Sequence, residues 1–140
     1  MSRYLSPLAL EGIVASEGLA TVALAATTFF TTPNKDDYNG ALYEADIYLR
    51  VNTTDGGTTP TVGITITATE GADAIAYVVP LMTLAGAIDT SAALTADQAF
   101  HGRVFFRADK NTAVQWTRVS GGTPSNDGNF DVFILVHRIK

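Results

Sequence analysis

The sequence predicts an all-β protein, an antiparallel β-sandwich or jelly roll of about eight strands with an extended N-terminal arm. Short runs rich in Val, Ile, Thr and aromatic residues recur between clusters of Gly, Pro, Asn and Asp, which is typical of sandwiches. No segment after residue 20 keeps a helical period. The 140 residues suffice for one domain with its own hydrophobic core.

The first strand signals lie between the N-terminal residues and the middle of the chain. Residues 19–30 are rich in Ala, Val, Thr and Phe and are expected to form one strand or a pair of short strands. A loop that ends in the turn dipeptide Asn39-Gly40 follows. The clearest strand comes next, because apolar and polar residues alternate from Tyr43 to Asn52. One side of this strand should therefore face a core and the other should face water or a polar partner.

The second half of the sandwich is predicted from further short segments. Residues 62–81 contain two strands, and Pro80 indicates that the second is an edge strand or ends there. Residues 89–97 are expected to form an irregular crossing or a short helix. Residues 102–119 have the pattern of a hairpin around a tight turn. Trp116 in this hairpin is expected in the core, with sugar stacking or a subunit contact as alternatives.

The closing segment, Asn129 to Ile139, indicates that the protein works as part of an assembly. Residues Val132 to Val136 are apolar without interruption, whereas a strand exposed on one side would alternate. We therefore expect both sides to be covered, one by the domain's own core and the other by a second sheet or chain. Only 16% of the residues are charged, against about 25% in an average soluble protein. Such a composition fits a surface that is partly covered.

The N-terminal residues fit no strand pattern. We expect an arm over residues 1–18 and a jelly-roll-like β-sandwich domain over residues 19–140. The arm should be held by neighbouring chains or fold back on its own domain. There is no basic start followed by an apolar run, and the apolar stretch 19–26 is shorter than the about 20 residues that span a bilayer. A soluble protein with no membrane partner and no cleaved signal is the resulting expectation.

No residue pattern indicates catalysis. The chain has no cysteine, which excludes disulfides and thiolate metal sites. His101 and His137 lack a second histidine or cysteine at metal-ligand spacing and are expected to be packed, strand-end or interface residues. Asp36-Asp37 and Asp55-Gly56-Gly57 fit turns, with calcium ligands as the alternative. We expect no catalytic residues, no cofactor and no metal.

The charge distribution argues against nucleic-acid binding. The net charge is −5, and the nine basic residues form no dense run. A protein that binds nucleic acid needs a basic patch that displaces counterions from phosphates. The arginines between residues 103 and 118 are expected on solvated strand faces and turns.

Aromatic side chains among charges mark candidate partner contacts. Tyr48 lies on the polar side of its strand between Asp46 and Arg50, which suits a binding anchor, with a cross-strand pair as the alternative. Phe105 is flanked in the same way by two arginines, and arginine beside aromatic residues is common at interfaces. Together with the arm and the closing strand, the candidate positions are Arg3, Tyr4, Leu5, Tyr48, Arg50, Arg103, Phe105, Arg107, Phe133, Leu135 and His137.

Two stretches resemble small structural proteins of tailed bacteriophages. They are residues 38–71, with the alternating strand Tyr43 to Val51, and residues 112–139, with Trp116 and the turn before the closing strand. The resemblance implies a phage jelly roll, often trimeric, that serves as a capsid decoration (cement) protein or as part of a tail fibre or spike. The chain has no stalk, coiled coil or second domain, which favours the decoration role.

On this resemblance, we expect a non-enzymatic virion structural protein that is made in the host cytoplasm and resides on the capsid surface. It would bind the major capsid protein and stabilise the head as a homotrimer. A tail-fibre or baseplate receptor-binding jelly roll is the alternative. A carbohydrate-binding module with Tyr48 or Trp116 as its platform is the second alternative.

Overall fold

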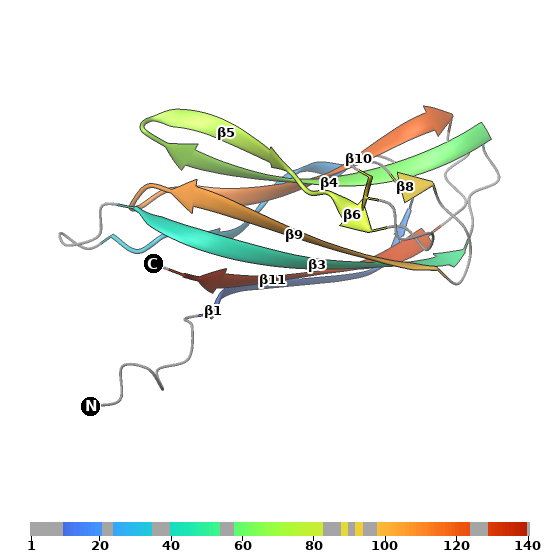
Figure 1. Cartoon of the computed structure of the whole chain (residues 1–140), viewed down its shortest axis with the longest axis horizontal. Helices are drawn as coiled ribbons and strands as arrows, with labels where there is room; N and C mark the ends of the chain where they lie inside the picture. Colours follow the sequence, from blue (N-terminus) through green and yellow to red (C-terminus); the bar gives the residue numbers. More distant parts are fainter. Residues whose placement is uncertain are drawn as a thin grey trace.

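The structure is a computed structural model. It describes residues 10–20, 24–34, 40–53, 58–82, 88–89, 92–93, 98–123 and 129–139. Within these residues the chain is all-β, with two antiparallel sheets and no helix, so the predicted β-sandwich is confirmed (Figure 1). The described residues form eleven strands, three of them only two residues long, where the sequence predicted about eight.

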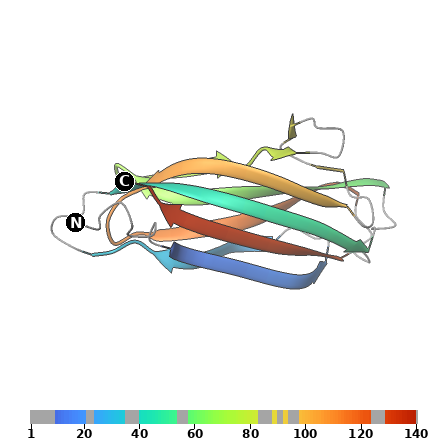
Figure 2. The same ribbon diagram turned by 60° about the horizontal axis from the view of Figure 1, so that its bottom comes forward.

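The two sheets lie face to face, as Figure 2 also shows from a second direction. The six-stranded sheet contains, in spatial order, β1 (Leu10–Ala20), β11 (Asn129–Arg138), β3 (Ala41–Thr53), β9 (Ala99–Ala108), β6 (Leu81–Met82) and β7 (Ile88–Asp89). The five-stranded sheet contains β2 (Leu24–Thr31), β10 (Ala113–Thr123), β4 (Thr58–Glu70) and β5 (Asp73–Val78), with β8 (Ala92–Ala93) paired to β4.

Residues 10–20 form strand β1, although the sequence predicted an arm over residues 1–18. β1 pairs antiparallel with β11, from Leu10 opposite His137 to Ala20 opposite Asn129, with two register shifts on the way. The side-chain pattern did not reveal this strand, because an edge strand joins the sheet through backbone hydrogen bonds that any non-proline residue can form. Residues 1–9 of the predicted arm lie outside the described residues.

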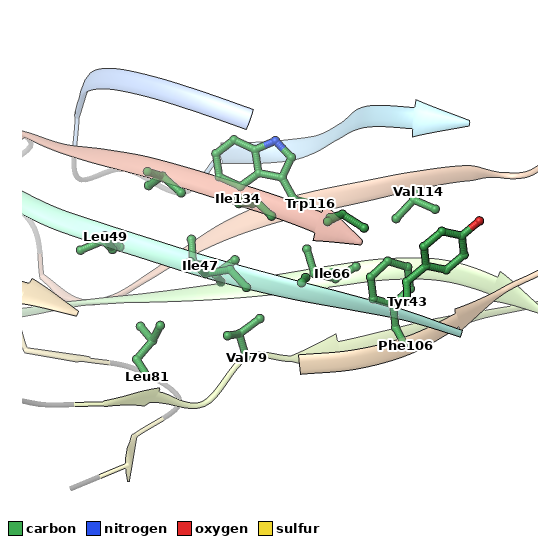
Figure 3. Packing of buried hydrophobic residues seen from close by; sticks show 14 of the residues in the cluster. Tyr43, Ile47, Leu49, Ile66, Val79, Leu81, Phe106, Val114, Trp116 and Ile134 are labelled. Atoms are coloured by element: carbon green, nitrogen blue, oxygen red, sulfur yellow. The ribbon is translucent and has the colours of Figure 1, made fainter. Parts of the chain in front are cut away.

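The core fills the space between the sheets, because each long strand turns alternate side chains inward. In β3, every second residue from Ala41 to Val51 is buried, and Figure 3 shows several of these side chains meeting those of the opposite sheet. Trp116 is 2% exposed, so its predicted core position is confirmed. Arg118 lies on β10, as Trp116 does, and its side chain is buried. Burial lowers the pKa of Arg118. The expectation of a solvated arginine was therefore wrong at this position.

Strand β5 lies at the edge of the five-stranded sheet, as Pro80 indicated. β5 pairs only with β4 among the described strands and ends at Val78, two residues before Pro80, as the sequence predicted. The backbone N–H of Val79 still donates to the carbonyl of Ile64 at 3.0 Å. Within the predicted crossing at 89–97, the structure describes parts of β7 and β8; the other residues lie outside the described part.

Replacing Gly102 with alanine should destabilise the sandwich. Gly102 pairs with Leu81 of β6, and a Cβ atom would lie 2.6 Å from the carbonyl oxygen of Pro80 and 2.7 Å from Cγ1 of Val79. The backbone of β6 would have to move, so we expect a loss of about 1–3 kcal/mol in the free energy of unfolding. Urea denaturation measures it, with Ala99→Ser on the exposed side of β9 as control. An unchanged midpoint for Gly102→Ala would contradict this packing.

Candidate functional site

The outer face of the six-stranded sheet is the side of β11, β3 and β9 that points away from the core. On β11, Val132, Ile134 and Val136 are buried, whereas Phe133 and Leu135 are 38% and 36% exposed. The sequence predicted cover on both sides of this strand. The core supplies one cover, and no described residue of this chain buries the other side. An uncovered apolar side is what the sequence led us to expect of a subunit within an assembly.

The strand register joins the exposed residues into rows across the outer face. Tyr48 of β3 lies between Phe133 of β11 and His101 of β9. The rings of Tyr48 and Phe133 are in contact, with centroids 6.1 Å apart and planes tilted by 56°. Tyr48 therefore forms the cross-strand pair that was the alternative prediction. It also remains 42% exposed, so it is still available as an anchor.

The candidate positions from the sequence converge on this one face. Strand alternation and register place eight of them there: Tyr48, Arg50, Arg103, Phe105, Arg107, Phe133, Leu135 and His137. Among the described residues, Phe105 is the most exposed large apolar side chain, at 52%. The other three candidates, Arg3, Tyr4 and Leu5, lie outside the described residues.

Two acidic residues that the sequence reasoning did not select hold the centre of the outer face. Nε of Arg103 lies 2.9 Å from Oδ1 of Asp46 and 3.1 Å from Oε1 of Glu44. Nε2 of His101 lies 3.5 Å from the same Asp46 oxygen. The alternation of β3 could have identified both acids from the sequence, since Glu44 and Asp46 share a side of the strand with Tyr48. Arg103 is thus shared by two carboxylates, which leaves an excess of negative charge beside the exposed aromatic side chains.

The charge cluster also perturbs Asp46. Partial burial acts to raise the pKa of Asp46, but the hydrogen bond and charge of Arg103, with smaller contributions from His101, outweigh it and hold the pKa below its usual value. A carboxyl group with a lowered pKa in the folded state stabilises the fold above its unfolded pKa of about 3.9, and the contribution is lost as the pH falls through the folded pKa.

Replacing Asp46 with asparagine should therefore remove part of the acid sensitivity of the fold. Between pH 5 and pH 2 (roughly the range in which carboxyl groups titrate), the wild type should lose more stability than Asp46→Asn. The difference should be small, because the Arg103 side chain is half exposed and solvent screens the pair. Thermal unfolding at several pH values measures it. Identical acid dependence of both proteins would show that Asp46 carries no such contribution.

At the end of the outer face, Arg107 also has a structural contact. Its Nε lies 3.4 Å from Oε1 of Glu70, and the Tyr77 hydroxyl donates to Oε2 of Glu70 at 3.1 Å. The same hydroxyl accepts a hydrogen bond from the Arg107 backbone N–H at 3.4 Å. Burial raises the pKa of Tyr77, and the Glu70 contacts raise it further. This cluster links β9 to β4 and β5 and so ties the two sheets together.

A hollow of about 340 Å³ lies in the centre of the outer face. Tyr48, Phe133 and Leu135 are among the described residues that line it, and its lining is almost entirely apolar. Among the described residues, no group of three or more His, Cys, Asp or Glu side chains is placed to hold a metal ion. Asp36-Asp37 and Asp55-Gly56-Gly57 lie outside the described residues. The hollow suits insertion of an apolar side chain.

In the part of the chain that the structure describes, no helix is long and apolar enough to cross a bilayer.

The class that fold and face define is an all-β sandwich with one aromatic and charged outer face. No protein-family model and no curated protein matches the chain. Among solved structures, it is similar to a chain in "Structure of infectious bursal disease virus Gx strain", with 12% identity and a TM-score of 0.35. The match covers 90% of this chain and 29% of that chain. A TM-score of this size does not establish a common fold.

Proposed function

We propose that this chain is a non-enzymatic virion structural protein, a head decoration (cement) protein that binds the major capsid protein as a homotrimer. The observation that supports an assembly role is the outer face of the six-stranded sheet, where Tyr48, Phe105, Phe133 and Leu135 stay exposed together. Exposed apolar patches of this kind mark sites of protein contact. The resemblance of residues 38–71 and 112–139 to phage structural proteins supports the virion assignment.

A cement protein needs many copies and broad contact surfaces, and it needs no active site. A standard interface buries roughly 800 Å² per partner, and contacts with several capsid subunits at once would add avidity. In this proposal, Arg3, Tyr4 and Leu5 provide a second contact beyond the sandwich. The tail receptor-binding role remains the alternative.

Virus particles that lack the protein test the proposal. Particles assembled without this chain should release their contents at a lower temperature than complete particles, and purified protein added back should restore the original temperature. Equal heat resistance with and without the protein would contradict a cement role. If the particles were equally heat resistant but no longer adsorbed to host cells, the tail receptor-binding alternative would replace it.

Deleting residues 1–9 should separate attachment from folding. The deletion removes Arg3, Tyr4 and Leu5 but leaves all of β1, so the sandwich should keep its unfolding midpoint. Binding to particles that lack the protein should weaken at least tenfold, or about 1.4 kcal/mol. A longer deletion that reached into β1 would expose the edge of β11 and confuse the two effects. Unchanged binding by the shortened chain would exclude the N-terminal contact.

A further inference from the structure

The outer side of β3 carries two opposite charges at equal spacing from an aromatic residue. Asp46 precedes Tyr48 by two residues, and Arg50 follows it by two, so all three side chains lie on the same side of the strand. Arg50 is exposed and forms no ion pair with any other described residue. An acid and a base placed symmetrically about Tyr48 make this face complementary to a second copy of itself.

We propose that the outer face of the six-stranded sheet binds the same face of a second copy across a twofold axis at Tyr48. The axis lies in the plane of the sheet and perpendicular to the strands. It brings Arg50 of each copy over Asp46 of the other. Tyr48 and Phe133 share a row across β3 and β11, so the rings of the two copies meet at the centre of the contact.

The same operation sets the neighbouring rows against each other. The row of Leu135, Asp46 and Arg103 faces the row of Asp131, Arg50 and Ala99. Acid therefore meets base on β3, Arg103 meets the small neutral Ala99, and Leu135 meets Asp131, so the charge complementarity comes from β3. On the axis itself, Phe133, Tyr48 and His101 each face the same residue of the other copy. A capsid protein would have no reason to match this internal symmetry, whereas a second copy matches it by construction.

The size of the outer face sets the strength of the contact. Its three strands, β11, β3 and β9, lie about 4.8 Å apart and each have about ten residues of about 3.4 Å, which makes a face of roughly 490 Å². A standard interface uses about 800 Å² per partner, so the twofold contact belongs to the small, transient class.

This contact goes beyond the homotrimer of the proposed function. It uses the same outer face that supports the assembly role, so the capsid contact would fall to other surfaces of the chain. A twofold contact alone gives two chains. Combined with a threefold contact on another surface, it gives six chains with three twofold axes. Assemblies of three chains would leave the proposed function intact but exclude the twofold contact.

Two single variants with opposite charge changes test the Arg50–Asp46 exchange. The Arg50→Asp chain carries two acids around Tyr48, and the Asp46→Arg chain carries two bases, so neither should pair with itself. Mixed in equal amounts, they should form pairs that contain one chain of each, because each acid again meets a base. Native mass spectrometry resolves the two variants by mass. Wild-type self-association of both variants, or a mixture without mixed pairs, would overturn the proposal.

A cysteine on the proposed axis provides an independent test. The chain has no cysteine, so Tyr48→Cys introduces a single thiol. A short bismaleimide that reaches across the about 10 Å between packed sheets should link two such chains efficiently. The matched control is Ala76→Cys, an exposed position on β5 of the other sheet. Equal linking at both positions would contradict the axis. A third variant, Phe133→Asp, separates a second copy from the capsid as the occupant of the face. If this variant lost capsid binding but self-associated as fully as the wild type, the face would belong to the capsid contact and the twofold contact would be excluded.

Discussion

Replacing Trp116 with alanine should lower the free energy of unfolding by about 3–5 kcal/mol, a large part of the 5–15 kcal/mol that stabilises a typical domain. Trp116 lies between the sheets close to Val114 and Ile134, as Figure 3 shows, and it is opposite Ile66 in the strand register. Its removal leaves a cavity that rigid sheets cannot close. Urea denaturation followed by far-ultraviolet circular dichroism measures the change.

Trp116→Phe is the matched control, because it keeps an aromatic ring in the same space. It should lose less than half as much stability as Trp116→Ala. A Trp116→Ala protein with the wild-type midpoint would contradict the packing of the core. The same burial excludes Trp116 as the sugar platform of a carbohydrate-binding module, since a ligand cannot reach a side chain that is 2% exposed.

Replacing Phe133 with aspartate should abolish self-association of the chain through its outer face, while the chain stays folded. The structure assigns the effect to assembly, because Phe133 points outward beside Tyr48. The free energy of unfolding should fall by less than about 1 kcal/mol. Association should weaken at least tenfold, because a carboxylate would have to lose water at the centre of the contact.

Light scattering and urea denaturation on the same samples separate these two effects. Ala76→Asp places the same charge on the exposed edge strand of the other sheet and should leave association unchanged. If Phe133→Asp self-associates as strongly as the wild type, the outer face of the six-stranded sheet is not a contact surface between copies of this chain.

The sequence revealed the core better than it revealed the edges. Strict alternation from Tyr43 to Asn52 identified β3 and its two sides, since one side of that strand is buried along its whole length. β1 has no comparable pattern, because it joins the sheet by backbone pairing with β11. The order of apolar and polar residues therefore gives little indication of an edge strand of this kind.

The candidate face was predictable residue by residue but not as a unit. Alternation indicated Tyr48 and Phe105 as contacts on their own strands, and the uninterrupted apolar run of the closing strand indicated Phe133. That these residues form one continuous face follows only from the strand register, in which Tyr48 lies opposite Phe133 and Glu44 lies opposite Phe105. A shift of one residue would have turned each set to the other side of the sheet. The ion pairs of Arg103 depend on the same register and were not foreseen.

The copy number of this chain in purified virus particles tests the central claim most directly. Quantitative mass spectrometry against the major capsid protein gives that number. A decoration protein that covers the head should be present in hundreds of copies per particle (on the order of the capsid subunits it contacts). A handful of copies, or none, would contradict the proposed function.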